Sequence, residues 1–233
     1  MTAHTPTAVL DMGTYGKIRV DNLYEMYVPT DAKDVYLTIY QTKTAQTLGS
    51  WVYDAAACLS DFMLTESFRK KFCPEGLHGK SLIELGAGTG IVGLISAYHG
   101  CDVIITDLKP LVPLMQFNID KNLELFKGKA EAKELQWGED CVQNFAVPDI
   151  LVLANCVYNE NVLEELLQTT LALSTNETLI LACYEERTRG IRNLICRWHE
   201  MVSPHFQVTV IPNQDLPQEH MQEYVKVVAM KRI

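Results

Sequence analysis

The sequence has no long basic run and no long apolar run, and each absence excludes a class of protein. The longest basic run is RKK at residues 69–71, and the formal net charge is -9 with a sequence pI near 5.1. A nucleic-acid-binding surface usually carries a basic stripe, whereas an acidic surface suits small molecules or basic protein segments. No apolar run approaches the roughly 18 residues of a membrane span, and the N-terminus lacks the features of a secretory signal. We therefore expect a cytoplasmic protein with neither a nucleic-acid nor a membrane partner.

Cysteine and histidine patterns that hold metals or form disulfides are also missing. The seven cysteines are odd in number and include no C-x-x-C pair, which argues against a disulfide framework and a structural zinc site. Several lie inside apolar runs, where free thiols pack as small hydrophobes. The six histidines form no recognisable metal constellation. These observations indicate a reducing compartment and no metal cofactor.

A regular alternation of strand and helix patterns is present from residue 81 onward. With 233 residues, 48% of them hydrophobic, the chain can form one large domain. Strands are predicted over 81–85, 101–107, 129–137, 148–156, 177–185, 205–212 and 223–232, and helices over 89–100, 109–126, 160–174 and 190–202. The last two strands have no helix between them and so form an antiparallel pair. The pattern predicts an α/β, doubly wound, seven-stranded and mostly parallel sheet with an antiparallel last strand.

The segment before residue 81 has a different character. Residues 1–15 are predicted to be a flexible tail. Residues 16–29 and 34–42 carry β-branched and aromatic residues in partial alternation, which predicts an N-terminal β-hairpin, and residues 53–72 have the apolar spacing of a helix. We therefore divide the chain into the tail and one domain over 16–233, with a β extension at 16–50 and a core at 51–233.

A glycine loop follows the first strand of the regular pattern. Gly86, Gly88 and Gly90 allow a tight turn and let a ligand approach the backbone closely. In open α/β sheets, ligands bind beyond the carboxyl ends of the strands. A dinucleotide fingerprint would place Gly or Ala at the position of Ile91, so the loop departs from that pattern.

Two acids near this loop suggest which ligand it holds. Glu84 would repel a pyrophosphate but suits a ligand with positive charge. Asp107 ends the next strand, at about the 20-residue offset where an acid bonds ribose hydroxyls. A ligand with a ribose, a positive centre and no phosphate is S-adenosylmethionine.

Several linked segments carry a family resemblance over about residues 48–190. IELGAGTGIVGL resembles motif I of the seven-strand, Rossmann-like methyltransferases, and WVYDAA, VIITDLKPLVPLM, KELQWGED and PDILVLANCVYNENVLEELLQTT resemble further family segments. Together they resemble methyltransferase family 16, and within it the methyltransferase-like-21 branch of protein-lysine methyltransferases. ACYEERTRG is similar to a run in the branch member that acts on valosin-containing protein.

The resemblance implies roles for single residues. The cofactor contacts it implies are Gly86, Ala87 and Gly88 at the methionine part, Asp107 at the ribose, Trp137 at the adenine and Ala154 through its backbone. Tyr53 stands where the family has Trp, and Trp51 could substitute for it. Glu84 either holds the cofactor's amino group indirectly or is purely structural. Glu185 and Glu186 either rim the cleft and attract a basic segment or are ordinary solvated acids.

The chain departs from the family pattern at NCVY. Asn155 holds the place of an acid and Tyr158 that of an aromatic residue; both are predicted to be catalytic. Asn155 is uncharged and cannot serve as a base, although its carbonyl can orient an amine. Three interpretations stay open: a protein-lysine methyltransferase, a methyltransferase for another nitrogen such as glutamine or a terminal amine, and a cofactor-binding interaction module. The resemblance implies a chaperone, an ATPase or a translation elongation factor as the protein substrate, and we expect a monomer.

Overall fold

The computed structural model describes residues 8–11, 17–20, 22–28, 35–42, 49–138, 142–218 and 223–233. Seven strands in these ranges form one sheet in the order β10-β11-β9-β8-β5-β6-β7. Their bounds are β5 Ser81–Leu85, β6 Asp102–Asp107, β7 Ala130–Glu134, β8 Ile150–Ala154, β9 Leu179–Glu185, β10 Phe206–Val210 and β11 Val225–Arg232. None of the helices in the described ranges combines the length and apolar character that crossing a bilayer requires.

The sheet confirms the predicted mixed topology. β5 pairs in parallel with β6 and β8, and further parallel pairs join β6 to β7 and β8 to β9. β11 runs antiparallel to both β9 and β10, so the last strand is the one that opposes the others. β7, the most polar of the predicted strands, is an edge strand of the sheet, so one side of its backbone has no neighbouring strand in that sheet.

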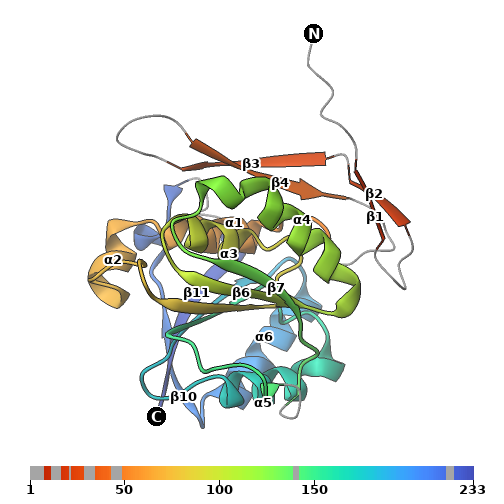
Figure 1. The fold of residues 1–233 in the computed structure, drawn as a ribbon. Coiled ribbons are helices and arrows are strands. Elements are labelled where there is room, and N and C mark those ends of the chain that lie inside the picture. The colour runs from red at the N-terminus through yellow and green to blue at the C-terminus, as the bar shows by residue number, and fades with distance from the viewer. Residues whose placement is uncertain are drawn as a thin grey trace.

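Helices cover both faces of this sheet (Figure 1). Their bounds are α1 Asp54–Phe62, α2 Glu66–Phe72, α3 Ile91–Tyr98, α4 Val112–Asn122, α5 Leu163–Ala172 and α6 Arg189–Val202. α1, α3 and α4 lie on one face, and α5 and α6 on the other. Because both faces are covered, the central strands are buried apart from Ser81 at the start of β5 and Ala154 at the end of β8.

The strand order reverses beside β5. The chain proceeds from β5 through β6 to β7 on one side, then returns to place β8 on the other side of β5. Loops that leave β5 and β8 therefore diverge to opposite faces and open a crevice at the carboxyl ends of the two strands. The glycine loop and the NCVY segment both start there.

The helix predicted over residues 53–72 is wrong as a single element, because the chain forms α1 and α2 with a break between them. Thr65 is the cause of the new start. Its backbone is extended, and its hydroxyl accepts a hydrogen bond from the Phe68 N–H at 3.0 Å, which caps α2. Glu66 follows in the first turn, where a negative charge favours the helix dipole.

The N-terminal segment forms two small antiparallel pairs. β3 (Asn22–Val28) pairs with β4 (Val35–Gln41), which matches the predicted hairpin. β2 (Lys17–Val20) pairs instead with β1 (Ala8–Asp11), so part of the predicted tail is paired backbone. The rest of that tail lies outside the described residues.

Two buried asparagines on α4 attach this segment to the core. The Asn118 side-chain oxygen accepts a hydrogen bond from the Tyr40 N–H at 2.8 Å, and its side-chain nitrogen donates one to the Tyr40 carbonyl at 3.0 Å. Asn122 makes the same pair of bonds with Thr38 at 2.9 Å each. The two amides thus take the place of a neighbouring strand along β4. Asn118 also donates to the Thr89 carbonyl at 3.0 Å, which ties the glycine loop to the same helix.

Candidate active site

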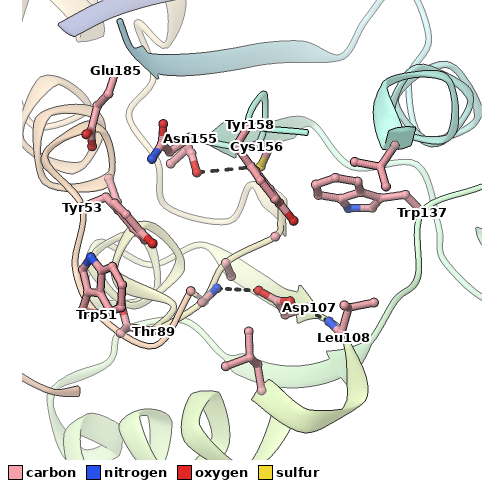
Figure 2. A pocket seen from close by; sticks show the side chains of 18 of the residues that line it. Trp51, Tyr53, Thr89, Asp107, Leu108, Trp137, Asn155, Cys156, Tyr158 and Glu185 are labelled. Carbon is pink, nitrogen blue, oxygen red and sulfur yellow. Dashed lines mark hydrogen bonds between the residues drawn. The ribbon is translucent and has the colours of Figure 1, made fainter. Parts of the chain in front are cut away.

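A cavity of about 690 Å³ lies at the carboxyl ends of the parallel strands, as expected for the reversal of strand order. Its walls come from the residues that follow β5, β6, β7, β8 and β9 and from the start of α1. Its size is typical of a site for a small organic molecule. Figure 2 shows Trp51, Tyr53 and Glu185 along one wall, Asp107, Leu108 and Trp137 along the other, and Asn155 and Tyr158 between them.

The glycine loop is a cradle that side chains would fill. Gly86 and Gly88 have φ of 58° and 59°, in the left-handed region that favours glycine. A Cβ on Gly88 would lie 2.2 Å from the Gly49 carbonyl oxygen, and a Cβ on Gly86 would lie 3.0 Å from the Trp137 ring and 3.1 Å from the Cys156 sulfur. The absence of side chains therefore allows the loop to pack closely against Gly49, Trp137 and Cys156 while it lines the cavity.

Asp107 is held by the backbone on both sides. Its Oδ2 accepts the Gly88 N–H at 2.8 Å, and its Oδ1 accepts the Leu108 N–H at 2.7 Å. Burial raises the pKa of this carboxyl to about 6, although these two hydrogen bonds act to lower it. The carboxylate thus has a fixed orientation at the cavity wall, and each oxygen keeps a second lone pair for a hydroxyl donor.

Glu84 lies outside the cavity, which corrects the electrostatic argument made from the sequence. The residue is 1% exposed, and its Oε2 accepts the Gly93 N–H at 2.7 Å in the first turn of α3. Burial raises the pKa of its carboxyl to about 8, so the group is mostly neutral at pH 7. Glu84 therefore supplies no full negative charge to a ligand, and its contacts are those of a structural residue.

This buried acid predicts a pH dependence of stability. Because the pKa rises from an ordinary 4.5 to about 8 on folding, the folded protein keeps a proton that the unfolded chain loses between these values. The free energy of unfolding should therefore fall as pH rises, by at most about 1.4 kcal/mol per unit inside that window. Glu84→Gln keeps an acceptor for Gly93 and should remove most of this slope in urea unfolding at pH 5.5 to 8.5.

The exposed acid Glu131, on the edge strand β7, offers the control for this experiment. Glu131→Gln makes the same substitution at the surface and should leave the slope as it is in the unchanged protein. An unaltered slope in Glu84→Gln would show that the buried carboxyl is not the group responsible.

Aromatic side chains form the wall beyond Asp107. The Trp137 ring follows β7, and its centroid lies 6.5 Å from that of Tyr158, with the two planes tilted by 60°. Tyr158 is 42% exposed and comes from the loop after β8. Cys156 also lines the cavity and donates its S–H to the Leu85 carbonyl at 3.1 Å.

Asn155 has an unusual backbone. Among the described residues it is the one non-glycine residue in the left-handed region, with φ of 59°. Asn adopts this conformation more readily than most residues, which gives a structural reason for an amide here. Its N–H donates to the Cys183 carbonyl at 2.8 Å and extends the pairing of β8 with β9. This pairing fixes the backbone of Asn155 where the residue lines the cavity.

The structure brings together nearly all of the residues predicted from the sequence. Those that line the cavity are Tyr53, Gly86, Ala87, Gly88, Asp107, Trp137, Ala154, Asn155 and Tyr158, and Glu84 is the exception. Trp51 also lines it, with its ring centroid 5.2 Å from that of Tyr53. Sequence reasoning missed Cys156 and Arg187, although both lie beside predicted site residues in the chain.

Comparison with known proteins assigns the chain to a family. The sequence profile of the family described as Lysine methyltransferase matches residues 31–200, which is more than half of the chain. The chain belongs to the lysine methyltransferase family.

Several curated relatives in this family are protein-lysine methyltransferases by name. Protein N-lysine methyltransferase METTL21A of Mus musculus is 37% identical over 136 residues, which are 57% of this chain and 59% of the relative. METTL21A of Danio rerio is 36% identical over 149 residues, 61% and 65% of the two chains. Protein-lysine methyltransferase METTL21E of Mus musculus is 31% identical over 177 residues, 74% and 66%. The matches thus span about three fifths to two thirds of these relatives, and they confirm the predicted branch of the family.

Solved structures show the same fold at low sequence identity. A 16S rRNA methyltransferase of T. thermophilus in complex with AdoMet and guanosine has a TM-score of 0.58 and 16% identity, covering 91% of this chain and 51% of that one. A magnesium protoporphyrin IX methyltransferase of Synechocystis with bound SAH has a TM-score of 0.53 and 11% identity, covering 77% and 84%. These likenesses confirm the predicted class of fold.

S-adenosylmethionine is the cofactor that the sequence predicts for this member of the family. The cavity fits it on two observations. Gly86 and Gly88 line the cavity and present backbone without side chains to it. The oriented Asp107 carboxylate presents acceptors that suit a pair of ribose hydroxyls, with Trp137 beyond it as an apolar ring surface.

Proposed function

We propose that this chain is a protein N-lysine methyltransferase that uses S-adenosylmethionine. The observation that carries the proposal is the shared cavity, in which the glycine cradle and Asp107 lie beside Asn155 and Tyr158. A cofactor site and a polar acceptor site are thus adjacent, as a group transfer requires. The names of the relatives support lysine as the acceptor.

Each part of the cofactor has residues in the chain that suit it. Gly86, Ala87 and Gly88 would hold the methionine part, Asp107 the ribose and Trp137 the adenine, with the Ala154 backbone nearby. Tyr53 contributes an aromatic edge to the same space. When bound, S-adenosylmethionine supplies a methyl group made electrophilic by the neighbouring sulfonium.

The residues of the acceptor side position a nitrogen and exclude water. Only a neutral amine has the lone pair that attacks a methyl group, so the lysine ammonium must first lose a proton, which passes to solvent. The Asn155 carbonyl can accept an N–H bond and orient the amine, and the Tyr158 ring can favour positive charge that develops there. Catalysis then depends on holding the amine in place within a partly apolar cavity.

The substrate we propose is a protein segment with a basic residue, from a chaperone, an ATPase or a translation elongation factor. The net charge of -9 favours the approach of such a segment. We propose further that the enzyme is a cytoplasmic monomer. The scattered cysteines support a reducing compartment.

A second acceptor has one observation in its favour. Asn155 is uncharged, and an amide at this place suits an amide or terminal amine nitrogen, which carries less charge than a lysine ammonium. A chain that only binds the cofactor would keep the cradle and Asp107 and transfer nothing. One experiment distinguishes a lysine acceptor, another nitrogen acceptor and cofactor binding without transfer.

Purified protein is incubated with cell lysate and radioactive S-adenosylmethionine, and the labelled protein is digested and examined by mass spectrometry. We expect the label on a lysine side chain. Label on glutamine or a terminal amine would overturn lysine as the acceptor. An unlabelled lysate together with cofactor binding by calorimetry would overturn the enzymatic proposal as a whole.

A further inference from the structure

Glu185 ends β9 next to the unusual Asn155. Its neighbour two residues earlier, Cys183, accepts the Asn155 N–H at 2.8 Å, so both residues leave adjacent strands at the same edge of the sheet. Glu185 lines the cavity and is 2% exposed, which rules out the ordinary solvated acid that the sequence allowed. A carboxylate is therefore present beside the position where the family places one.

The two oxygens of Glu185 have different partners. Oε1 accepts the Ala55 N–H at 2.8 Å, in the first turn of α1, where a helix favours negative charge. Oε2 is buried, and no well-aligned hydrogen bond reaches it from the residues that the structure describes. An ion pair with the Arg187 guanidinium covers it instead. This second oxygen is thus held by one cation, and a carboxylate oxygen has a further lone pair that can accept an N–H bond.

Arg187 is poorly suited to be a permanent partner. Its side chain is 47% exposed, and its guanidinium lies 5.5 Å from the centroid of the Tyr53 ring and 4.0 Å from Asp54 Oδ2. A cation that pairs with a carboxylate and faces an aromatic ring at the cavity wall has the contacts that a lysine ammonium would seek. The arginine can move into solvent at modest cost, because nearly half of its side chain is already exposed.

We propose that Glu185 is the residue that binds the ammonium of the acceptor lysine and that Arg187 occupies this place until the lysine displaces it. The proposal rests on the proposed function of the same cavity. It gives the chain an acceptor-side acid on β9 in place of the acid that Asn155 lacks on β8. Glu185 would recognise the cation, while Asn155 would orient the amine by its carbonyl.

The groups around Glu185 and Arg187 favour the exchange of one cation for another over protonation of Glu185. Asp54, which accepts the Tyr224 hydroxyl at 2.7 Å, already lies 4.0 Å from the guanidinium and can receive the displaced arginine. Burial raises the pKa of the Glu185 carboxyl, while the Ala55 N–H and Arg187 act to lower it. A cation in the Arg187 position therefore keeps the acid ionised, whichever cation it is.

The test measures binding of a blocked lysine, N-acetyl-lysine-N-methylamide, to the protein without methyl donor, by NMR titration. Arg187→Ala should lower the Kd for this probe at least tenfold, because the competing cation is gone. Adding Glu185→Gln to that variant should return the Kd at least to its original value. Gln keeps an oxygen for the Ala55 N–H, and circular dichroism checks that the variants fold.

A neighbouring ion pair supplies matched controls. Glu186 follows Glu185 in the chain, and Arg192 lies 3.6 Å from its carboxylate. Neither Glu186 nor Arg192 lines the cavity. Arg192→Ala and Glu186→Gln make the same charge changes and should leave the Kd unchanged. The norleucine analogue of the probe, which lacks the ammonium, should not respond to any variant.

Two results would overturn the proposal. One is an Arg187→Ala variant that binds the probe no more tightly than the unchanged protein. The other is a double variant that binds it as tightly as Arg187→Ala alone. Neither measurement depends on methyl transfer, so the outcome of the labelling experiment and the outcome here are separate.

Discussion

Replacing Asp107 by Asn should raise the Kd for S-adenosylmethionine on the order of 100-fold. Hydrogen bonds to a charged acceptor contribute about 1.5–3 kcal/mol each, and tenfold in Kd corresponds to about 1.4 kcal/mol. In the present structure both oxygens already accept a backbone N–H, from Gly88 and Leu108. An asparagine has one carbonyl oxygen, so its amide nitrogen must face one of these donors. The variant therefore loses charge and disturbs the loop together.

The pH dependence of binding gives an independent check on Asp107. Hydroxyl donors stabilise the ionised carboxylate, and burial places its pKa at about 6. Cofactor binding should therefore strengthen as pH rises from 5 toward 7 and then level off. The rise should be absent from Asp107→Asn. Calorimetry at several pH values measures both effects.

Asp102, at the opposite end of the same strand, provides the matched control. It is exposed, and its Oδ1 accepts the Lys129 N–H at 3.2 Å. Asp102→Asn should bind the cofactor as the unchanged protein does. Equal affinity in the two variants would exclude Asp107 as a cofactor ligand.

The sheet could be predicted from the sequence because its strands are short, apolar and separated by helices. In β5 and β8, burial on both faces removes the alternation of polar residues, and the apolar runs stand out directly. Local chemistry also marks the start of α2, since Thr65 and Glu66 form a recognisable helix start. The apolar spacing of residues 53–72 nevertheless continues across the break between α1 and α2, so spacing alone predicts a single helix.

The candidate site was predictable where its residues follow a strand and lie in the glycine loop. Glu84 was misjudged because the sequence gives no sign of how closely α3 approaches β5. That approach requires Gly93, whose added Cβ would lie 2.9 Å from Glu84 Oε2. The left-handed backbone of Asn155 is likewise set by its pairing with β9.

Glu185 shows a third limit of sequence reasoning. An acid at the end of a predicted strand ordinarily faces solvent, and only the arrangement of α1 against β9 buries this one. The contact joins residues 130 positions apart, from Glu185 to Ala55, and neither residue has a local pattern that predicts it. Functional acids that act through such contacts require the three-dimensional structure for their detection.

Gly88→Ala should raise the Kd for S-adenosylmethionine at least 100-fold. The new Cβ would lie 2.2 Å from the Gly49 carbonyl oxygen, which is backbone and cannot rotate away. The loop must therefore move, and the Gly88 N–H moves away from Asp107 with it. Because the two residues depend on one hydrogen bond, Gly88→Ala with Asp107→Asn should lose less than the sum of the two single losses.

A glycine without this contact separates the clash from the cost of backbone strain. Gly79 has φ of 75°, close to the 59° of Gly88, but an added Cβ there meets no atom within 4 Å. Gly79→Ala should lower the free energy of unfolding by about 1–2 kcal/mol for the left-handed backbone and leave cofactor affinity unchanged. If Gly88→Ala has the same modest effect and still binds the cofactor, the close approach to Gly49 does not shape the site. A loss confined to Gly88→Ala would show that the cradle depends on contact between two backbone segments, and that glycine is needed there for space as well as for its conformation.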